Sequence, residues 1–498
     1  MKTKRSPKTI AGHLGRITDN PIILGIATGL YPLVFYYSRN FGMSNSWEQL
    51  AFFVVLFLFF PIIVFFVLKK ISKFSILGKW RKSILPFFNL FIFFYFIKII
   101  LYTDAERKII LGIFIVSVLC AYFLHKHFKK WLTVQLVLAL IGFIGLLPTI
   151  FSYINYSTKW TQQPDDIEEV VFEKRPNIYY IQPDGYVNFS ELEKAEYNID
   201  NSGFKSFLEE RNFENYHNFR SNYVSTLTSN SATFMMKHHY YNGNTDYTKM
   251  PNTRENIVSE NAVLSIFKNN GYKTHFISEH PYLLVNRPKL GFDYANFEYN
   301  EIPYITTGFN VAKDVSFELE TAMASKSDDG NFFFVEIFEP GHISSVKSAS
   351  KGKEKEREQW LEKREIANAK LEKIINIIIA QDPSALIIIM ADHGGFVGLE
   401  YTDEFNHKTF GSNIVYSAFG AMLSIRWPND EVPAESQYLK SSINVFRILF
   451  SYVSGNQKYL QHLQGDESYF VLKSGEDPGV YQYVDGNGNV NIKKIEIK

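Results

Sequence analysis

The chain changes character roughly a third of the way along its length. Up to about Ser152 it consists mainly of apolar runs rich in Phe, whereas the remainder mixes charged, polar and turn-forming residues. A helix needs about 20 apolar residues to cross about 30 Å of hydrocarbon, and five runs have roughly that length. They are Pro21–Tyr37, Ala51–Leu68, Ile84–Leu101, Ile109–Leu124 and Leu132–Tyr153. The pattern predicts a five-span transmembrane domain over residues 1–155.

Two other interpretations of these runs are less consistent with the sequence. A cleaved signal peptide would end in a small-residue cleavage pattern, but none follows Tyr37 and further apolar runs come after it. Core helices of a soluble protein would usually keep a polar face, and runs such as Phe52–Leu68 have none. Membrane insertion is therefore favoured.

Basic residues gather in alternate loops between the apolar runs. They are Lys2, Lys4, Arg5, Lys8 and Arg16 before the first run, Lys69, Lys70, Lys73, Lys79, Arg81 and Lys82 after the second, and Lys126, Lys129 and Lys130 after the fourth. Cytoplasmic loops retain Lys and Arg, while the loops Ser38–Gln49 and Tyr102–Lys108 carry few of them. With five spans, the chain then leaves the cytoplasm. We expect a multi-pass protein of the cell (inner) membrane whose later half is extracytoplasmic, or periplasmic.

Composition excludes several classes of protein. The 498 residues carry a formal net charge of +1, and no zinc-knuckle or basic-aromatic pattern is present, so nucleic-acid binding is disfavoured. The single cysteine, Cys120, lies inside an apolar run, which excludes intramolecular disulfides and Cys-rich metal sites. A lipid bilayer is the partner that the composition does predict.

The later half has the pattern of an α/β domain. Residues 156–176 form a polar, acidic connector, after which short β-rich runs alternate with amphipathic stretches through 177–498. Five runs are nearly continuously apolar, as expected of strands buried on both faces. They are Asn177–Gln182, Lys273–Ser278, Asn331–Phe338, Ala385–Ala391 and Ala421–Arg426. We expect a helix-covered, mainly parallel sheet.

Two further elements complete this prediction. A long helix should run from about Lys351 to Ala380, because Leu361, Ile366, Leu371, Ile374 and Ile378 recur at helical spacing. Near the end of the chain, Asp477–Gly479 and Asp485–Gly488 read as turns, and the second should close a terminal β-hairpin.

Acidic and imidazole side chains follow the predicted strands. Asp184 comes after the first strand, and the pair Asp392 and His393 ends the strand Ala385–Ala391. Each alone is commonly a turn or a helix cap, but reactive groups of open α/β sheets gather at the carboxyl ends of strands. Mixed Asp and His ligands suit Zn²⁺ or Mn²⁺ better than Ca²⁺. The sequence therefore predicts one divalent metal, Zn or Mn, at Asp184, Asp392 and His393.

A nucleophile is available where a loop turns into a helix. The segment Ser221–Met236 is rich in hydroxyls, and Thr226 is the candidate. Coordination to a metal lowers the pKa of a hydroxyl, and helix N-terminal amides stabilise the anionic group that it attacks. The same cluster, Ser225, Thr226, Thr228 and Ser229, is also typical of a helix N-cap without chemistry. The pattern alone leaves both interpretations open.

These residues resemble the alkaline phosphatase/sulfatase superfamily, and the five-span layout looks most like its membrane-anchored branch of lipoteichoic acid synthases and lipid A phosphoethanolamine transferases. The resemblance implies a metal-ligating nucleophile at Thr226, since Thr226-Leu-Thr-Ser-Asn230 lies on the sulfatase motif Cys-x-Pro-Ser-Arg with Ser229 matching Ser. Thr228 is the alternative nucleophile. The family also implies metal ligands at Asp184, Asp392 and His393, and substrate-binding histidines at His342 and His407.

The chain departs from the family pattern at three points. No Pro or Arg follows Thr226 in the motif, so maturation to formylglycine is not expected. Gly185 stands where two-metal members carry a second Asp, which suggests one principal metal, and Asp184 replaces the Glu usual in membrane synthases. The resemblance implies a phosphotransferase that moves a phosphoglycerol- or phosphoethanolamine-like headgroup from a phospholipid donor to a glycan or lipid-linked acceptor through a phospho-Thr intermediate. The alternatives are a sulfatase-like hydrolase of sulfate or phosphate esters and a catalytically silent membrane scaffold.

Overall fold

The computed structural model describes residues 18–71, 80–101, 106–194, 196–240, 250–407, 410–472 and 477–496. The chain divides into two compact units. The first comprises Met1–Asn155 with Val285–Arg287 and Pro303–Thr307, and the second comprises Tyr156–Leu284, Pro288–Ile302 and Gly308–Lys498. Several positions of the predicted charge pattern lie outside the described residues. They are Lys2, Lys4, Arg5, Lys8, Arg16, Lys73, Lys79 and the loop residues 102–105.

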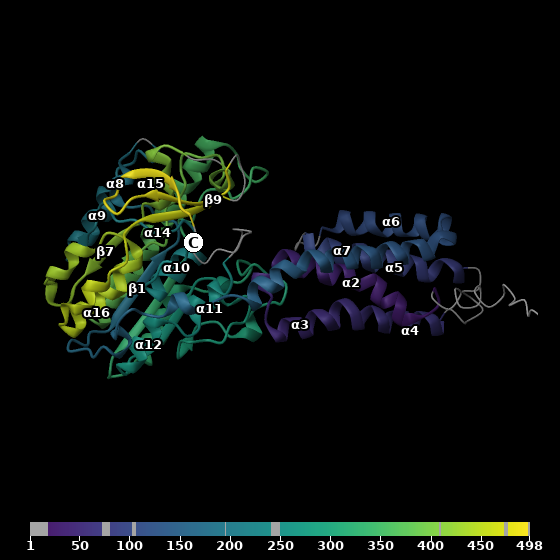
Figure 1. The fold of residues 1–498 in the computed structure, drawn as a ribbon, viewed down its shortest axis with the longest axis horizontal. Coiled ribbons are helices and arrows are strands. Elements are labelled where there is room, and N and C mark those ends of the chain that lie inside the picture. Colours follow the sequence, from purple (N-terminus) through teal and green to yellow (C-terminus); the bar gives the residue numbers. More distant parts are fainter. Residues whose placement is uncertain are drawn as a thin grey trace, which may run out of the picture. The chain divides into compact units, whose positions relative to one another are not determined.

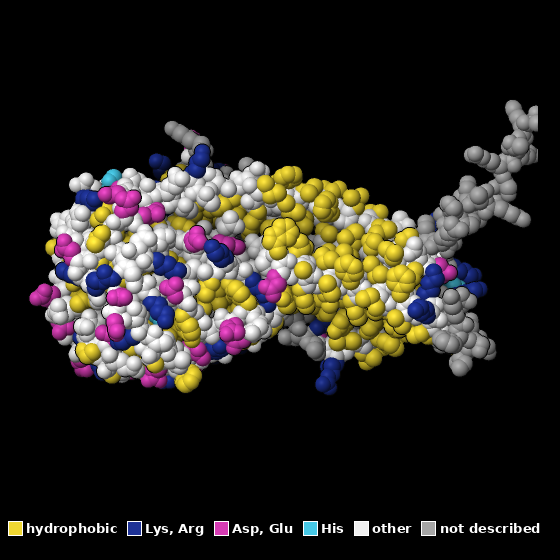
Figure 2. Space-filling model, turned by 90° about the horizontal axis from the view of Figure 1, so that it is seen from below, with side chains coloured by type: hydrophobic (Ala, Val, Ile, Leu, Met, Phe, Trp, Pro, Cys, Tyr) yellow, Lys and Arg dark blue, Asp and Glu magenta, His cyan; other side chains and the backbone are white. Residues whose placement is uncertain are grey.

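The first unit consists of apolar helices (Figure 1). They are α2 (Pro21–Asn40), α3 (Trp47–Val54), α4 (Phe60–Ile71), α5 (Arg81–Leu101), α6 (Arg107–Phe123) and α7 (Phe128–Ile154), with a π-helical segment, Val55–Phe59, joining α3 to α4. Hydrophobic side chains cover much of the surface of these helices in Figure 2. Four helical stretches are long and apolar enough to cross a membrane: Pro21–Met43, Trp47–Ile71, Lys82–Leu101 and His125–Thr161. The chain is therefore a membrane protein.

The predicted count of five spans is too high by one. The run Ile109–Leu124 does form a helix, α6, but this helix has only 17 residues. At 1.5 Å per residue it is about 25 Å long, which is short of a hydrocarbon core of about 30 Å. Within the described residues, four helices meet the length and composition of a span.

A buried amide joins three of the membrane helices. Asn89 of α5 donates from Nδ2 to Thr28 Oγ1 of α2 at 2.6 Å and to Gln135 Oε1 of α7 at 3.0 Å. In a medium without water, such hydrogen bonds between helices contribute about 1 kcal/mol each. They fix the relative register of α2, α5 and α7 where apolar packing alone would allow sliding.

The second unit is built on a seven-stranded, mainly parallel sheet, as predicted. Its order is β2-β7-β6-β1-β5-β3-β4. The strands are β1 (Ile178–Pro183), β2 (Phe213–Asn215), β3 (Lys273–Ser278), β4 (Tyr294–Ala295), β5 (Asn331–Ile337), β6 (Leu386–Met390) and β7 (Leu423–Arg426). The central strands β6, β1, β5 and β3 run parallel, while β7 is antiparallel to β6 and β2 to β7. Every residue of β1, β5 and β6 is buried, which explains their continuous apolar runs.

Helices cover the sheet (Figure 1). They are α8 (Phe189–Leu192), α9 (Ser202–Glu209), α10 (Thr226–Met235), α11 (Thr253–Val258), α12 (Ala262–Asn269), α13 (Val315–Ala324), α14 (Lys353–Gln381), α15 (Ser412–Phe419) and α16 (Val445–Ser454). The long predicted helix is α14, and Leu371, Ile374 and Ile378 are buried as expected. Ile366 is 50% exposed, so its predicted place in the core is wrong. The buried face instead carries Trp360 and Ala367, which are about two helical turns apart.

A small antiparallel sheet ends the chain. Its strands are β8 (Ser468–Leu472), β9 (Gly479–Val484) and β10 (Val490–Lys494), in the order β10-β9-β8. The predicted hairpin is β9–β10, and Asp485 Oδ1 in its turn accepts hydrogen bonds from the amides of Asn487 and Asn489, both at 2.9 Å. The third strand, β8, was not predicted.

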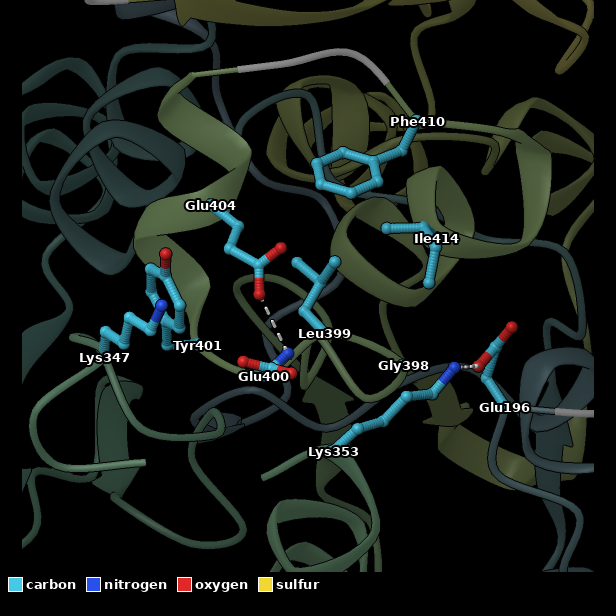
Figure 3. A pocket seen from close by; sticks show the side chains of 10 residues that line it. All are labelled: Glu196, Lys347, Lys353, Gly398, Leu399, Glu400, Tyr401, Glu404, Phe410 and Ile414. Carbon is cyan, nitrogen blue, oxygen red and sulfur yellow. Dashed lines mark hydrogen bonds and ion pairs between the residues drawn. The ribbon is translucent and has the colours of Figure 1, made fainter. Parts of the chain in front are cut away.

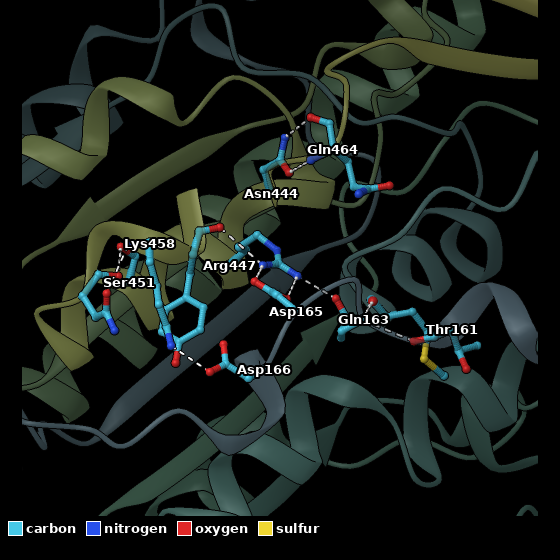
Figure 4. A network of polar contacts seen from close by, with 12 residues as sticks. Thr161, Gln163, Asp165, Asp166, Asn444, Arg447, Ser451, Lys458 and Gln464 are labelled. Carbon is cyan, nitrogen blue, oxygen red and sulfur yellow. Dashed lines mark hydrogen bonds and ion pairs between the residues drawn. The ribbon is translucent and has the colours of Figure 1, made fainter. Parts of the chain in front are cut away.

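The connector at 156–176 is fixed to the soluble unit by a buried ion pair (Figure 4). Arg447 of α16 is fully buried and donates to Asp165 Oδ2 at 2.7 Å, to Asp165 Oδ1 at 3.1 Å and to Gln163 Oε1 at 2.8 Å. A bidentate guanidinium–carboxylate pair fixes both partners in direction as well as in distance. The connector is therefore an ordered part of the unit that follows it.

Candidate metal centre

Three of the predicted ligands meet at the carboxyl edge of the sheet. Asp184 follows β1, and Asp392 and His393 follow β6, the strand beside it. One ligand atom from each of the three lies within 4.8 Å of the others. His393 Nε2 is 3.5 Å from Asp184 Oδ1 and 3.4 Å from Asp392 Oδ2. Parallel pairing of β1 and β6 thus brings Asp184 close to two residues that lie 208 and 209 positions later in the sequence.

The backbone orients these side chains toward a common point. Asp392 Oδ1 accepts hydrogen bonds from the amides of Gly185 at 3.1 Å and His393 at 3.0 Å. His393 Nδ1 lies 2.8 Å from the carbonyl oxygen of Gly394, so this nitrogen carries the proton and Nε2 keeps its lone pair. Within the described residues, Asp184 Oδ1 and Asp392 Oδ2 are buried without a hydrogen-bond partner. Two such carboxylate oxygens facing an imidazole lone pair fit a divalent cation.

The raised pKa values of Asp184 and His393 also indicate that added positive charge stabilises the cluster. Burial, and then the neighbouring carboxylate of Asp392, raise the pKa of Asp184 to about 8. Burial acts to lower the pKa of His393, but the carboxylates of Asp392 and Asp184 outweigh it and the pKa is raised. Metal-free, the cluster retains protons that a cation would displace.

Gly185 accounts for the missing second acid. Its φ is +64°, a conformation that favours glycine, and a Cβ there would lie 2.3 Å from the carbonyl oxygen of Gly341. The position has no space for an Asp side chain. Among the described residues, Asp184, Asp392 and His393 form the one group of three acidic, His or Cys side chains with metal-binding geometry.

Helix α10 packs on the sheet through the ring of Phe234. Phe234 packs on Tyr180 of β1 and Phe334 of β5, with ring centroids 6.2 and 5.1 Å apart. The helix starts near the carboxyl edge, because Ser221 just before it donates its amide to the carbonyl of Phe419 at 2.8 Å, beside the turn that carries His393. The helix therefore runs antiparallel to β1.

This direction gives a register for the candidate nucleophile. Thr226, Asn230 and Phe234 follow each other at four-residue intervals and share one helix face. Four helical residues and two strand residues each span about 6 Å, so Phe234 at Tyr180 predicts Asn230 level with Gln182 and Thr226 level with Asp184. Thr228 lies on another face, and its hydroxyl is 2.7 Å from Ser225 Oγ and 3.1 Å from Ser225 O, as in a helix cap. The participation of Thr226 in the metal site stays a prediction.

The two candidate substrate histidines lie in different surroundings. His342 packs near the cluster, with its ring centroid 6.2 Å from that of His393, and burial lowers its pKa, which keeps the ring neutral near pH 7. His407 follows the 3-10 helix η10 (Thr402–Asn406), is half exposed, and lies 3.2 Å from Asp403. The structure places His342, but not His407, in ring contact with a cluster residue.

A buried polar layer beneath the cluster was not predicted from the sequence. Glu336 of β5 is fully buried and accepts a hydrogen bond from Ser278 at 2.9 Å, and its register partner on β1 is Gln182. Burial, with smaller contributions from Asp184 and Asp392, raises the pKa of Glu336 well above its usual range. Glu336 Oε1, Gln182 Nε2 and both amide atoms of Asn230 lack partners among the described residues. A single acid inside the apolar run Asn331–Phe338 was the available signal.

The cavities formed by the described residues of the soluble unit include a smaller and a larger one. The smaller, of about 220 Å³, is lined by His342, Gln359, Lys363 and neighbouring residues. The larger, of about 500 Å³, is shown in Figure 3 and is lined by Glu196, Lys353, Glu400, Tyr401 and Phe410 among others. An ion pair of 3.3 Å between Lys353 and Glu196 closes one side of the larger cavity.

Part of the soluble unit is similar to a known protein family. Residues 192–420 match the family model described as Sulfatase. This stretch of the soluble unit is similar to the Sulfatase family. The matched region contains Thr226, His342, Asp392, His393 and His407, while Asp184 precedes it.

Three solved structures are among those that resemble parts of the chain. The periplasmic domain of EcEptC from Escherichia coli in complex with Zn is 11% identical over 58% of this chain and 85% of its own, with a TM-score of 0.40. The lipoteichoic acid synthase LtaP from Listeria monocytogenes is 14% identical over 66% and 91%, with a TM-score of 0.42. The integral membrane phosphoethanolamine transferase EptA from Neisseria meningitidis is 10% identical over 87% and 95%, with a TM-score of 0.39. None of the curated proteins compared matches the chain.

Proposed function

We propose that this protein is a metal-dependent phosphotransferase of the membrane. It moves a phospho-headgroup, of phosphoglycerol or phosphoethanolamine type, from a lipid donor to a glycan or lipid-linked acceptor. The observation that carries the proposal is the buried group of Asp184, Asp392 and His393 at the carboxyl edge of the sheet, with two carboxylate oxygens free to bind a cation. The four membrane-spanning helices suit a donor that resides in the bilayer.

The proposed reaction has two displacements at phosphorus. The hydroxyl of Thr226 loses its proton and attacks, the bond from phosphorus to the lipid oxygen breaks, and that oxygen takes up a proton. An acceptor hydroxyl then attacks the phospho-Thr and restores Thr226. Zn²⁺ or Mn²⁺ bound at Asp184, Asp392 and His393 would lower the pKa of the Thr hydroxyl and offset charge on the non-bridging oxygens.

Other groups of the chain support the same chemistry. Helix α10 begins near the carboxyl edge of the sheet, so its first amides would be suited to bind phosphate oxygens. His342 is neutral near pH 7, so its ring would be able to accept the proton that Thr226 loses and then, as an imidazolium, give it to the leaving oxygen.

A hydrolase of sulfate or phosphate esters is the second candidate, and the match to the Sulfatase family model favours it. In that reaction water replaces the acceptor hydroxyl. The absence of the Pro and Arg of the sulfatase motif after Thr226 argues against formylglycine, and so against ordinary sulfatase chemistry.

The decisive experiment uses the full chain in detergent with headgroup-labelled phospholipids and glycan or glycolipid acceptors. The parent should add the mass of a phospho-headgroup to an acceptor, and trapped enzyme should contain a phosphorylated peptide from Ser221–Lys237. Thr226→Ala should lower the rate about a thousandfold or more, because the nucleophile is removed. Thr228→Ala is the matched control and should keep most activity.

Two results would change the assignment. Release of free headgroup phosphate without a modified acceptor would indicate the hydrolase. Full activity in a folded, metal-loaded Thr226→Ala variant would remove Thr226 from the mechanism.

A further inference from the structure

Helix α14 presents two lysines, Lys363 and Lys370, toward the carboxyl edge of the sheet. They are seven residues apart and so lie on nearly the same helix face. Lys370 is neutralised, because its Nζ is 2.5 Å from both Glu279 Oε1 and Glu339 Oε2. In the part of the chain that the structure describes, Lys363 forms no ion pair. The two lysines thus differ in whether their charge is available to a ligand.

Lys363 lines the cavity of about 220 Å³ together with His342 and Gln359. Trp360, one turn earlier on α14, donates from Nε1 to the carbonyl of Gly341 at 2.9 Å and fixes this turn beside the His342 loop. The one carboxylate that lines the cavity, Glu356, accepts from the amides of Ser344 at 2.8 Å and Lys351 at 3.0 Å. The lining therefore offers an ammonium group and an imidazole to a ligand, because its one carboxylate is already hydrogen-bonded to backbone amides.

The cavity borders the metal cluster. The rings of His342 and His393 are 6.2 Å apart, and Trp360 bonds to Gly341, the residue before His342. The charge of Lys363 also reaches the cluster. Burial and Asp392 raise the pKa of the Asp184 carboxyl, and the charge of Lys363 opposes this rise. Burial lowers the pKa of His342, and the charge of Lys363 adds to this lowering.

The charge balance of the site leaves a role for this ammonium. One divalent cation offsets the two carboxylates of Asp184 and Asp392 and no more. A phosphodiester brings a further negative charge, which spreads over its equatorial oxygens during transfer. Because Lys370 is already paired, Lys363 is a cation of α14, among the described residues, whose charge is available to balance it.

We propose that Lys363 is a substrate-binding residue that pairs with the phosphate oxygens of the donor, and that the cavity shared with His342 holds this anionic group beside the metal cluster. The proposal rests on the proposed phosphotransferase function. It assigns anion recognition to α14, an element that the chain's sulfatase-like motifs do not include.

The test measures binding of inorganic phosphate to the zinc-loaded full chain in detergent by titration calorimetry. Lys363→Ala should weaken phosphate binding about tenfold or more, because a charged partner is lost. Lys363→Arg should retain most of the affinity. Lys373→Ala is the matched control on the same helix. Among the described residues Lys373 forms an exposed ion pair of 3.4 Å with Asp314, so the variant should bind phosphate like the parent.

Zinc content and melting temperature, equal in Lys363→Ala and parent, would show that the metal site and fold are intact. The proposal is overturned if the zinc-loaded parent fails to bind phosphate, or if Lys363→Ala binds it as tightly as the parent. A protein that binds phosphate through Lys363 but transfers no headgroup to any acceptor would contradict the phosphotransferase alone, so the two failures are distinguishable.

Discussion

Asp184 and Asp392 extend from neighbouring parallel strands, so their carboxyl groups are held close together whether or not a cation lies between them. Repulsion between two buried carboxylates is the second cause, after burial, of the raised pKa of Asp184. The metal-free protein must keep a proton on this pair near neutral pH. Metal and proton therefore compete for the same oxygens.

Chelation should lower the melting temperature more at pH 8 than at pH 6. The pKa of Asp184 is about 8 in the folded chain against an ordinary 3.8, so its protonation stabilises the metal-free fold fully below pH 3.8, and this contribution is lost as pH rises through about 8. Metal affinity changes in the opposite sense, rising by up to about tenfold per pH unit until Asp184 is ionised. Differential scanning calorimetry with and without chelator at both pH values measures the effect. Asp184→Asn has no such titration, and an equal pH dependence in that variant would contradict this explanation.

Individual residues of the candidate site were predictable where they directly follow a predicted strand. Asp184, Asp392 and His393 each follow an apolar run, and parallel pairing brings such ends together. Glu336 and Lys363 were not predicted, because an acid within a strand and a lysine among many on a charged helix have no distinguishing local pattern. Their significance appears only when burial and neighbours are known.

At the scale of elements, α10 connects the core to the reacting edge. Phe234 is fully buried against Tyr180 and Phe334, and the same face leads through Asn230 to Thr226. The position of the candidate nucleophile is thus set by aromatic packing two helical turns away.

Phe234→Ala should destabilise the protein by about 3–5 kcal/mol, because a buried aromatic ring is replaced by a cavity. Headgroup transfer should fall as well, since α10 loses the contact that sets its register. Thermal unfolding of the full chain and the transfer assay measure the two effects. Phe317→Ala, which removes a 64% exposed ring on α13, is the control and should alter neither.

The main elements followed from periodicity, and the errors have physical causes. Strands β1, β3, β5 and β6 were apolar runs because both faces of each are covered. The helix α6 was counted as a span although it is a few residues short, and Ile366 was assigned to the core although its face of α14 is exposed. Apolar composition alone indicates neither the exact length of a helix nor which of its faces packs against the sheet.

At the scale of the whole molecule, the buried pair of Arg447 and Asp165 joins distant parts of the soluble unit. Asp165→Ala should destabilise this unit by about 3–5 kcal/mol, because it leaves the guanidinium of a buried arginine unpaired. The adjacent pair of Asp166 and Lys458, also visible in Figure 4, is exposed, so Lys458→Ala should leave the melting temperature unchanged. Equal effects of the two substitutions would show that burial of the Arg447 pair is not what stabilises the connector.

The orientation of the membrane unit is testable with its single cysteine removed. In a Cys120→Ala background, Met43→Cys should react with a membrane-impermeant maleimide in intact cells. Lys126→Cys tests the span count, because the basic residues beside it would lie in the cytoplasm, and react only after permeabilisation, if the 17-residue α6 does cross. Labelling of Lys126→Cys in intact cells would show that α6 does not cross.

The anchored connector also decides where this protein can be shortened. Trp160 is buried, with its ring 5.7 Å from that of His239, and Gln163 and Asp165 bind Arg447. A truncation that begins at the first strand would remove all three and leave the buried Arg447 without Asp165 and Gln163. A recombinant fragment intended for crystals or assays should therefore begin ahead of Trp160, at about Tyr156, where the second unit starts.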